Sequence, residues 1–507
     1  MSDKLHLVRD EFLGDLRREE RRELLFRKQI YYSEEGKNSS MVEEADTKVL
    51  PELTVYGEAA QSLTEVVRTT LKEKADIDNI PMYVQALIHG TVAEQHKAAI
   101  LIRKISSSEV DEGCELILRT DVLPYIVELA KRDDQPYLQI ECNWTLANFC
   151  SRSEHIIRKV VEKGVIPIFL QNVSKLSLKL AEQALWGIGN LAAESSEYFE
   201  LLHSHNALAM LVTLYEKVKL DNKSIARSII WAASNLCRGR PVPPAEKTSC
   251  ALQMFVEVLK ETDRDETRIN CVWSIRSIAL KMPDGPEQLM NHNILPKLVD
   301  LLHSAQVQIL QPCLGIVGHF TAQRHDKINQ LVKLGIISGL ENVLSTHVKS
   351  IKKVALMVLA NIASSDVDCV EQILSCPSIL MTVFNLATCD FPELAENSIW
   401  VLGNMCITGS FRQVERLLDL NLLGVINHVL NSTNPTESLL CLLCDSLQGI
   451  CKSAQSESEQ HFDKLMEAIE KEGMLEPLEA LQDSHSSLVY QKSNALITEY
   501  FQTERAF

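Results

Sequence analysis

Apolar and polar positions recur along most of this chain with the period of an amphipathic helix, and the whole arrangement returns every 42 to 44 residues. Each unit opens with a turn and a hydrophobic entry, as in DVLPYIVEL from Asp121 and HNILPKLVDLL from His292. We expect a short helix, a glycine- or proline-marked turn and two longer helices in each unit. Such a unit cannot bury its leucine, valine and isoleucine face alone, so we expect neighbouring units to stack. The equivalent entry positions, spaced by 43, 42, 44, 43, 42 and 43 residues, are Pro124, Pro167, Ala209, Gln253, Pro296, Ser338 and Met381.

Repeats of this length are typical of armadillo and HEAT proteins. We therefore predict an all-α fold, a right-handed armadillo-repeat superhelical solenoid of about ten repeats, over residues 77–507. Residues 33–76 are polar with a negative excess, which predicts an acidic/polar linker. Residues 1–32 include LRREERRELLFRK, which predicts a basic helix, the alternative being a solvated charged helix without a partner.

Tryptophan occurs at one position of the repeat, with gaps of 42, 45, 42 and 127 residues, the last being about three units. An asparagine follows four of the five tryptophans four residues later, so the pair shares one helix face. Asparagine is a poor mid-helix residue, and its recurrence favours a function over an incidental place in the core. Its amide can pair with the backbone of an extended peptide. The tryptophans are Trp144, Trp186, Trp231, Trp273 and Trp400, and the asparagines are Asn148, Asn190, Asn235 and Asn404.

Composition narrows the class of partner. The net charge of −17 disfavours nucleic acid as the main partner and suits a basic protein or peptide, although acidity also serves solubility. No apolar stretch is long enough for membrane insertion, and we expect a soluble intracellular protein. The one C-x-x-C motif, Cys441/Cys444, lies in an apolar run, which favours buried reduced thiols over zinc. A glycine-rich phosphate loop, a metal set and a partnered nucleophile are missing from the sequence, so we predict no cofactor and no enzymatic activity.

Four stretches carry a family resemblance: ECNWTLANFCS, EQALWGIGNLAAES, WAASNLCRGRPVPP and SLVYQKSNALITEYFQTE. They resemble the second, third, fourth and tenth repeats of importin-α (karyopherin-α), the nuclear-import adaptor, and the chain looks like a divergent member. The resemblance implies an adaptor of the cytoplasm and nucleus that binds basic nuclear localisation signals in a concave groove and couples cargo to importin-β. Tryptophan faces would then form slots for lysine and arginine stems. The alternatives are a specialised armadillo scaffold or assembly factor for one partner, without importin-β-dependent transport, and an enzyme regulator that masks a basic segment.

By this resemblance the major peptide site lies in repeats two to four. The family's pocket for a single lysine, shaped by a glycine, a threonine and an aspartate, has Arg152, Ile157 and Glu194 here. We expect Arg152 to place a cation where the lysine enters, or to pair with Glu194 and close the pocket. Either way, simple basic motifs would bind weakly or an altered consensus would be preferred. The matched residues are Trp144, Asn148, Ser151, Gln183, Trp186, Asn190, Glu194, Trp231, Asn235, Arg238 and Trp273.

The family's minor site lies in repeats six to eight, and this chain keeps fewer of its matched residues there. Trp400 and Asn404 keep the pair in repeat eight, whereas repeat seven keeps Asn361 but has Met357 in place of tryptophan. Repeat six has His319 where the family has asparagine. A methionine can pack against a lysine stem without the cation–π attraction, so the sequence predicts a weak minor site.

The basic cluster near the N-terminus resembles part of the family's importin-β-binding helix. The family's second basic cluster, which folds back into the groove, corresponds here to IYYSEEGKNSS with one lysine, so we expect weak autoinhibition or none. The resemblance also implies a nuclear export factor as a partner. The residues matched to importin-β binding are Arg17, Arg18, Arg21, Arg22, Arg27 and Lys28.

Overall fold

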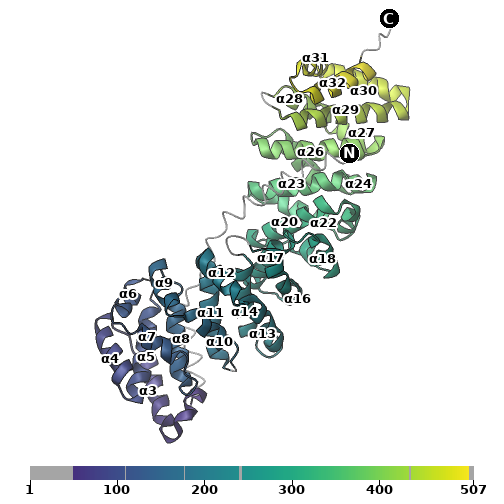
Figure 1. The fold of residues 1–507 in the computed structure, drawn as a ribbon. Helices are drawn as coiled ribbons and strands as arrows, with labels where there is room; N and C mark the ends of the chain where they lie inside the picture. The colour runs from purple at the N-terminus through teal and green to yellow at the C-terminus, as the bar shows by residue number, and fades with distance from the viewer. Residues whose placement is uncertain (1–49, 109, 176, 239–242, 433–434, 502–507) are drawn as a thin grey trace. The chain divides into compact units, whose positions relative to one another are not determined.

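The computed structural model describes residues 50–501 apart from 109, 176, 239–242 and 433–434. Every regular element in those ranges is an α-helix or a 3-10 helix, which confirms the predicted all-α class (Figure 1). The described residues divide into two compact units, an N-terminal unit of residues 50–282 and a C-terminal unit of residues 283–501. In both units helices follow one another in the order expected of the repeat.

The N-terminal unit contains the first five repeats, and its third helices are α5, α8, α11, α14 and α17. Its elements are η2 (Pro51–Ala59), α3 (Ala60–Lys72), η3 (Ile77–Asn79), α4 (Ile80–His89), α5 (Val92–Ser106), α6 (Glu112–Leu118), α7 (Leu123–Leu129), α8 (Pro136–Phe149), α9 (Glu154–Glu162), α10 (Val165–Val173), α11 (Leu178–Glu194), α12 (Ser196–Ser204), α13 (Ala207–Val218), α14 (Lys223–Cys237), α15 (Ala245–Thr248), η4 (Ser249–Ala251), α16 (Leu252–Glu261) and α17 (Asp265–Ala279).

The C-terminal unit contains the remaining repeats, and its third helices are α20, α23, α26, α29 and α32. Its elements are α18 (Gly285–Asn291), α19 (Leu295–Leu301), α20 (Val307–Gln323), η5 (His325–Lys327), α21 (Ile328–Lys333), α22 (Ile336–Ser345), α23 (Lys349–Ala363), α24 (Val367–Leu374), α25 (Pro377–Ala387), α26 (Pro392–Thr408), α27 (Phe411–Asp419), α28 (Leu422–Leu430), α29 (Glu437–Glu457), α30 (Glu459–Lys471), α31 (Leu475–Ala480), η6 (Leu481–Asp483) and α32 (Ser487–Tyr500).

A left-handed residue marks the turn before the second helix of most repeats. Gly164 has φ 81° immediately before α10, and Gly335 has φ 88° before α22. Glycine adopts this conformation without steric cost, and asparagine and aspartate tolerate it better than other residues. These turns are the markers from which the repeat was predicted. The other left-handed turn residues are Asp121, Asn206, Asn293, Asn421 and Gly473.

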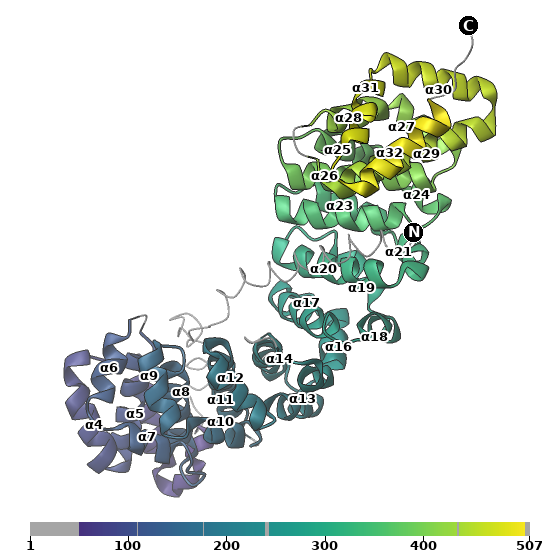
Figure 2. The ribbon, with the colours of Figure 1, turned by 45° about the horizontal axis from the view of Figure 1, so that its top comes forward.

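Consecutive third helices pack against one another within each unit. Figures 1 and 2 show α8, α11 and α14 side by side in the N-terminal unit. Close packing of α11 against α10 depends on glycine, because a Cβ on Gly187 of α11 would lie 2.2 Å from the ring of Phe169 in α10. Ile188 and Leu191 on α11 are completely buried. The stack therefore supplies the continuous core that a single repeat cannot form.

The solenoid begins earlier than predicted, because part of the expected linker is folded. Leu53 of η2 and Leu63 and Val67 of α3 are buried in one cluster with Ile100 and Tyr137 of the first two repeats. The apolar residues of this segment recur at helical spacing among polar ones. The prediction of a linker considered only the overall polar composition and therefore missed this helical pattern. Residues 51–72 are thus a cap on the first repeat, and residues 33–49 lie outside the described part of the chain.

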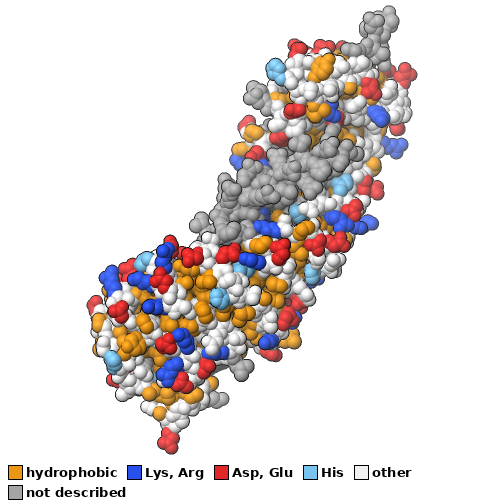
Figure 3. Space-filling model, in the orientation of Figure 1, with side chains coloured by type: hydrophobic (Ala, Val, Ile, Leu, Met, Phe, Trp, Pro, Cys, Tyr) orange, Lys and Arg blue, Asp and Glu red, His pale blue; other side chains and the backbone are white. Residues whose placement is uncertain are grey.

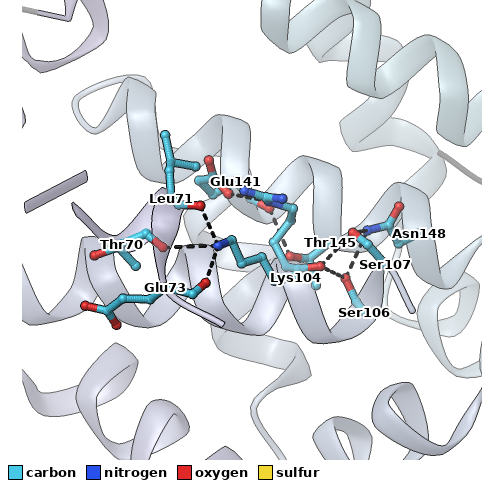
Figure 4. A network of polar contacts seen from close by, with 10 residues as sticks. Thr70, Leu71, Glu73, Lys104, Ser106, Ser107, Glu141, Thr145 and Asn148 are labelled. Atoms are coloured by element: carbon cyan, nitrogen blue, oxygen red, sulfur yellow. Dashed lines mark hydrogen bonds and ion pairs between the residues drawn. The ribbon is translucent and has the colours of Figure 1, made fainter. Parts of the chain in front are cut away.

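Lys104 of α5 holds the end of this cap. Its ammonium group donates hydrogen bonds to the carbonyl oxygens of Thr70 at 3.1 Å, Leu71 at 2.7 Å and Glu73 at 2.5 Å (Figure 4). The last carbonyls of a helix have no partners within the helix and carry a partial negative charge, so a lysine is a favourable partner for them. The contact joins α3 to the first repeat.

Two findings on other classes of site concern the described residues. No single helix in these ranges is both long and apolar enough to cross a membrane, although α24 and α25, bent by 91°, pass the test together by length and composition. The same ranges contain no group of three or more His, Cys, Asp or Glu side chains that could hold a metal ion.

All fourteen cysteines are free thiols, and most are buried, Cys441 and Cys444 included. Burial raises the pKa of the Cys114 thiol to about 11.

Candidate functional site

Three of the four asparagines that pair with tryptophan bridge neighbouring third helices. Asn235 of α14 donates from Nδ2 to the carbonyl oxygen of Gly189 in α11 at 3.0 Å. Asn148 of α8 donates in the same way to the hydroxyl oxygens of Ser106 and Ser107, at 3.0 and 2.9 Å. Mid-helix asparagine therefore has a structural use that the sequence reading did not foresee, namely a hydrogen bond to the preceding repeat.

Ser277 supplies this bridge in the fifth repeat, where asparagine is missing. Its hydroxyl donates to the carbonyl oxygen of Cys237 at the end of α14, at 2.9 Å. A short serine side chain thus makes the same kind of contact from the same helix position. The departure from the Trp/Asn pattern of the other repeats leaves a stacking contact in place, while the fifth repeat has no amide at this position that could meet a peptide backbone.

Two groove acceptors on α11 have no hydrogen-bond partner. The side-chain oxygens Oε1 of Gln183 and Oδ1 of Asn190 are both buried and unpaired. These residues lie three positions before and four positions after Trp186, so all three side chains share one face of the helix. Leaving a buried acceptor unpaired costs about 1–3 kcal/mol. These two oxygens can therefore accept hydrogen bonds from the N–H groups of a ligand or from water.

The tryptophan faces of the N-terminal unit already have partners within the chain. The Arg103 guanidinium lies 4.2 Å from the centre of the Trp144 ring, while its Nε donates to buried Glu141 at 2.9 Å. Trp186 and Trp231 have ring centroids 4.8 Å apart at an interplanar angle of 37°. An aliphatic stem between two parallel rings needs a ring separation of about 7 Å, twice the contact distance between carbon atoms. A lysine stem can enter this slot only if the two rings separate.

Trp273 carries two arginines of the chain itself. The guanidinium carbons of Arg238 and Arg276 each lie 5.2 Å from the centre of its ring. Trp273 is 6% exposed and Arg276 is 2% exposed, whereas Arg238 is half-buried at the end of α14. The cation–π positions that the sequence reading assigned to a basic peptide are filled here by residues of the groove.

The three residues matched to the lysine pocket differ in their surroundings. Arg152 donates to the carbonyl oxygen of Ser106 at 2.6 Å and is 3% exposed. Ile157 is completely buried within α9, so it offers no group to the groove. Glu194 ends α11 and is half-buried. Ser151 donates to the carbonyl oxygen of Asn148 at 2.7 Å.

Asparagine bridges also join third helices in the C-terminal unit, where fewer of the helices carry a tryptophan. Asn361 of α23 donates to the hydroxyl of Thr321 at 3.1 Å, and Asn404 of α26 donates to the carbonyl oxygen of Ala360 at 2.9 Å. Trp400 is half-buried on the same helix as Asn404, whereas Met357 is 3% exposed and packed into the core. A methionine so deeply packed presents little surface to a lysine stem, which weakens the predicted minor site further.

The sequence analysis missed several residues that lie against the tryptophans and asparagines. Arg103 and Arg276 were not singled out, although Arg103 lies 41 residues before Trp144, close to the tryptophan register of the first repeat, and Arg276 follows Trp273 by one helical turn. Ser106 gave no signal at all. The six basic residues assigned to importin-β lie in residues 1–49, outside the described part of the chain.

Comparison with known proteins agrees with this architecture. The family model for the armadillo/beta-catenin-like repeat matches residues 153–193. Importin subunit alpha-1b of Oryza sativa subsp. japonica is 26% identical over 433 residues, which cover 84% of this chain and 80% of that protein. Importin subunit alpha-8 of Arabidopsis thaliana is 26% identical over 413 residues, covering 80% of this chain and 90% of that protein.

Solved structures show the same fold. An engineered protein from a structural genomics programme covers 83% of this chain and 98% of its own length with a TM-score of 0.63 at 19% identity. A structure from work on the interaction between cadherin and beta-catenin covers 88% of this chain with a TM-score of 0.61 at 12% identity. These likenesses confirm the predicted armadillo-repeat solenoid. Along most of its length the chain is also similar to importin alpha subunits, at 26–27% identity.

Proposed function

We propose that this chain is a nuclear-import adaptor, which binds a basic segment of its cargo across α8, α11 and α14 and couples that cargo to importin-β. Relatives named as importin subunits along four fifths of the chain support the proposal. Residues 1–32 would supply the importin-β contact, and the complex would pass between the cytoplasm and the nucleus. The C-terminal unit would contribute at most a weak second site, centred on Trp400 and Asn404.

The unpaired acceptors Gln183 Oε1 and Asn190 Oδ1 are the observation that carries this proposal. An extended peptide presents a backbone N–H group at every residue, and neighbouring N–H groups on one side lie about 7 Å apart. Acceptors at two positions along a third helix, on the tryptophan face, suit the backbone of such a peptide. Satisfying both would recover part of the cost of leaving them buried and unpaired.

Glu194 supports a basic side chain on the bound peptide. It is the acidic residue at the end of α11, on the helix that also carries Gln183, Trp186 and Asn190. A lysine or arginine that reached it would form a charge-assisted hydrogen bond. Binding of its stem would require Trp186 and Trp231 to move apart from their 4.8 Å contact, which would reduce affinity by the cost of breaking that contact.

A direct binding measurement tests the proposal. A fluorescent peptide with a Lys-Lys-Arg-Lys core in a glycine/serine frame is titrated with the full-length chain and with Asn190→Ala. We expect the substitution to weaken binding by about 2- to 12-fold, the equivalent of one hydrogen bond. Asn431→Ala, in the turn after α28, is the matched control and should bind like the unaltered chain.

Coupling to importin-β needs its own experiment. Immobilised full-length chain is offered purified importin-β at two salt concentrations, with and without the basic peptide. Binding that weakens steeply with salt is expected, because the contact would depend on arginine clusters. Failure to bind either importin-β or the peptide would instead favour a scaffold for one specialised partner.

A further inference from the structure

Hydrophobic side chains gather on the surface of the N-terminal unit. Figure 3 shows them over the region in which Figure 1 labels α8, α10 and α11. A cleft of about 550 Å³ in this unit lies between α10 and α11 on one side and α13 and α14 on the other. Eight of the twelve described residues that line it are apolar. Both the volume and the apolar lining are typical of binding sites, whose volumes are about 300–1,000 Å³.

The cleft is separate from the tryptophan face on which a basic peptide would bind. Ala181, which lines the cleft, precedes Asn190 by nine residues on α11. Nine residues are two and a half helical turns, so the two side chains project from opposite sides of the helix. A molecule in the cleft would therefore leave Trp186 and Asn190 accessible.

One face of α13 supplies half of the lining. Its residues recur as neighbouring pairs four positions apart, so the pairs form a row along the helix axis. The row is about 12 Å long, which is a little more than two helical turns. One member of each pair is exposed and the other is half-buried. The pairs are Ala209/Met210, Thr213/Leu214 and Lys217/Val218.

Exposed leucines extend this apolar surface. Leu178, which lines the opposite wall of the cleft, is 44% exposed, and Leu220, two residues beyond Val218, is 88% exposed. A single exposed leucine is ordinary, whereas several beside an apolar cleft indicate an interaction site. A partner that covered them would gain the free energy of removing their surface from water.

The charged residues that line the cleft are cations, in a chain whose net charge is −17. Lys175 is paired with Asp133. Lys217 is exposed in the last turn of α13, and no described carboxylate forms an ion pair with it, since its neighbour Glu216 pairs with Lys219. A cation at the edge of an apolar cleft favours a partner with an acidic side chain at the matching place.

We propose that this cleft docks an amphipathic helix of a partner protein, whose apolar side chains enter between α10 and α13 and whose acidic side chain meets Lys217. The row along α13 suits a helix, because helix side chains at positions i, i+4 and i+7 also form a row of this length. Lysine at the edge of the cleft determines the charge of that helix. Docking here is an additional function, and the partner could be bound together with a basic peptide.

Helical peptides of defined charge test the proposal. Alanine-rich peptides of about sixteen residues, long enough to form a helix, carry three leucines spaced i, i+4 and i+7. Glutamate, glutamine or lysine stands at both ends of the leucine row. Fluorescence anisotropy with the full-length chain is measured at about 50 and 200 mM salt, between which screening changes substantially. We expect the glutamate peptide to bind about twofold to fivefold more tightly than the glutamine peptide and the lysine peptide to bind most weakly.

A charge reversal identifies the cation that the helix meets. Lys217→Glu should reverse the order, so that the lysine peptide binds more tightly than the glutamate peptide. Lys333→Glu is the matched control, because Lys333 is also exposed in the last turn of a helix, α21. This control should keep the original order.

A bulky side chain in the middle of the row should block the cleft. Thr213 is exposed, so Thr213→Trp adds volume there without replacing a core residue, and we expect all three peptides to bind about tenfold more weakly. Thr382→Trp in α25 is the control, because both threonines donate to the carbonyl oxygen four residues earlier. Circular dichroism melting curves establish that each variant is folded.

Several results would contradict docking of an acidic helix. Equal binding of the glutamate and lysine peptides would do so, as would failure of every peptide to bind at about 1 mM or unchanged binding in Thr213→Trp. Displacement of the glutamate peptide by dodecanoate would assign the cleft to an acyl chain instead. Displacement by the unlabelled Lys-Lys-Arg-Lys peptide would place the helix on the tryptophan face. The affinity of that basic peptide is measured separately, so the proposed function can stand whichever result is obtained.

Discussion

The guanidinium of Arg152 donates a hydrogen bond of 2.6 Å to the carbonyl oxygen of Ser106, the last residue of the preceding third helix. The contact joins the second repeat to the C-terminal end of α5, where carbonyl groups without helical partners carry a partial negative charge. It also fixes a cation, 3% exposed, at the position that the importin-α resemblance assigns to a pocket for a cargo lysine. Arg152 thus joins two stacked repeats, and on the resemblance it would also obstruct the pocket.

Removing this cation should have two opposite effects. Arg152→Gly should lower the unfolding free energy of the N-terminal unit by about 1–3 kcal/mol, because a charged hydrogen bond to a helix end is lost. It should also tighten binding of a lysine-core peptide, because the pocket is emptied. Urea unfolding and fluorescence anisotropy measure the two effects. Arg158→Ala, at an exposed partner of Glu154, should change neither by a comparable amount; an unaltered affinity in Arg152→Gly would show that the pocket is not used.

Two asparagines at the same helix register should respond differently to alanine. Asn235→Ala removes the 3.0 Å bridge to Gly189 and should cost about 1–2 kcal/mol of unfolding free energy. Asn190→Ala removes an acceptor that has no hydrogen-bond partner, so stability should change by less than about 0.5 kcal/mol. Peptide affinity should fall in Asn190→Ala. Equal losses of stability in the two variants would contradict the structural distinction between them.

A single methyl group at Gly189 should disturb the aromatic pair. Its Cβ would lie 2.2 Å from Cζ3 of Trp231, so the ring must leave its contact with Trp186. We expect Gly189→Ala to cost about 1–3 kcal/mol, the usual range for overpacking a core. Gly449→Ala in α29 is the matched control, since its nearest neighbour would be at an ordinary 3.5 Å and alanine favours a helix by about 1 kcal/mol. Thermal unfolding of both variants gives the comparison.

The N-terminal cap should loosen in mild acid. His96 is completely buried between the rings of Tyr56 and Tyr137, and burial holds the pKa of its imidazole below the usual range. The folded chain therefore resists protonation more than the unfolded chain does. Its contribution to stability is complete above about pH 6.5, the pKa of an unfolded histidine, and is lost as the pH falls from there toward the lower folded-state pKa.

Hydrogen exchange can follow this loss directly. The amide exchange rate of residues 51–67, corrected for the intrinsic dependence of exchange on pH, should rise as the pH falls from about 7.5 to 5.5. An ordinary histidine titrates in this interval. His96→Phe, which keeps an aromatic ring in the site, should remove most of the pH dependence. The exposed His347→Gln should leave it unchanged. Exchange that stays constant with pH in the unaltered chain would show that His96 does not control the cap.

Removal of residues 1–48 should leave peptide affinity unchanged, because the stretch that corresponds to the family's inhibitory cluster has one lysine. The truncation preserves the cap, whose first contact is the hydrogen bond from the Leu50 backbone to Thr64 at 3.3 Å. Anisotropy with the same peptide compares the truncated and full-length chains. A tenfold gain in affinity on truncation would mean that the N-terminal segment does inhibit the groove.

Much of the architecture can be predicted from the sequence because its determinants are local. The helical period of apolar residues, the glycine, asparagine or aspartate at each left-handed turn and the return of both every 42 to 44 residues specify the repeat without reference to distant contacts. Gly164 and Gly335 illustrate this, since each is required by the backbone of its own turn. The cap formed by residues 51–72 was missed, because its apolar residues become meaningful only beside Ile100 and Tyr137.

The sequence by itself determined the repeat, the register of tryptophan and asparagine and the resemblance to importin-α. Only the tertiary structure decided how those side chains are used. Asn235 meets Gly189 from 46 positions away, and the Arg103 guanidinium covers the ring of Trp144 from another repeat. Such pairs depend on the distance and rotation between two stacked helices, which periodicity along one helix does not specify.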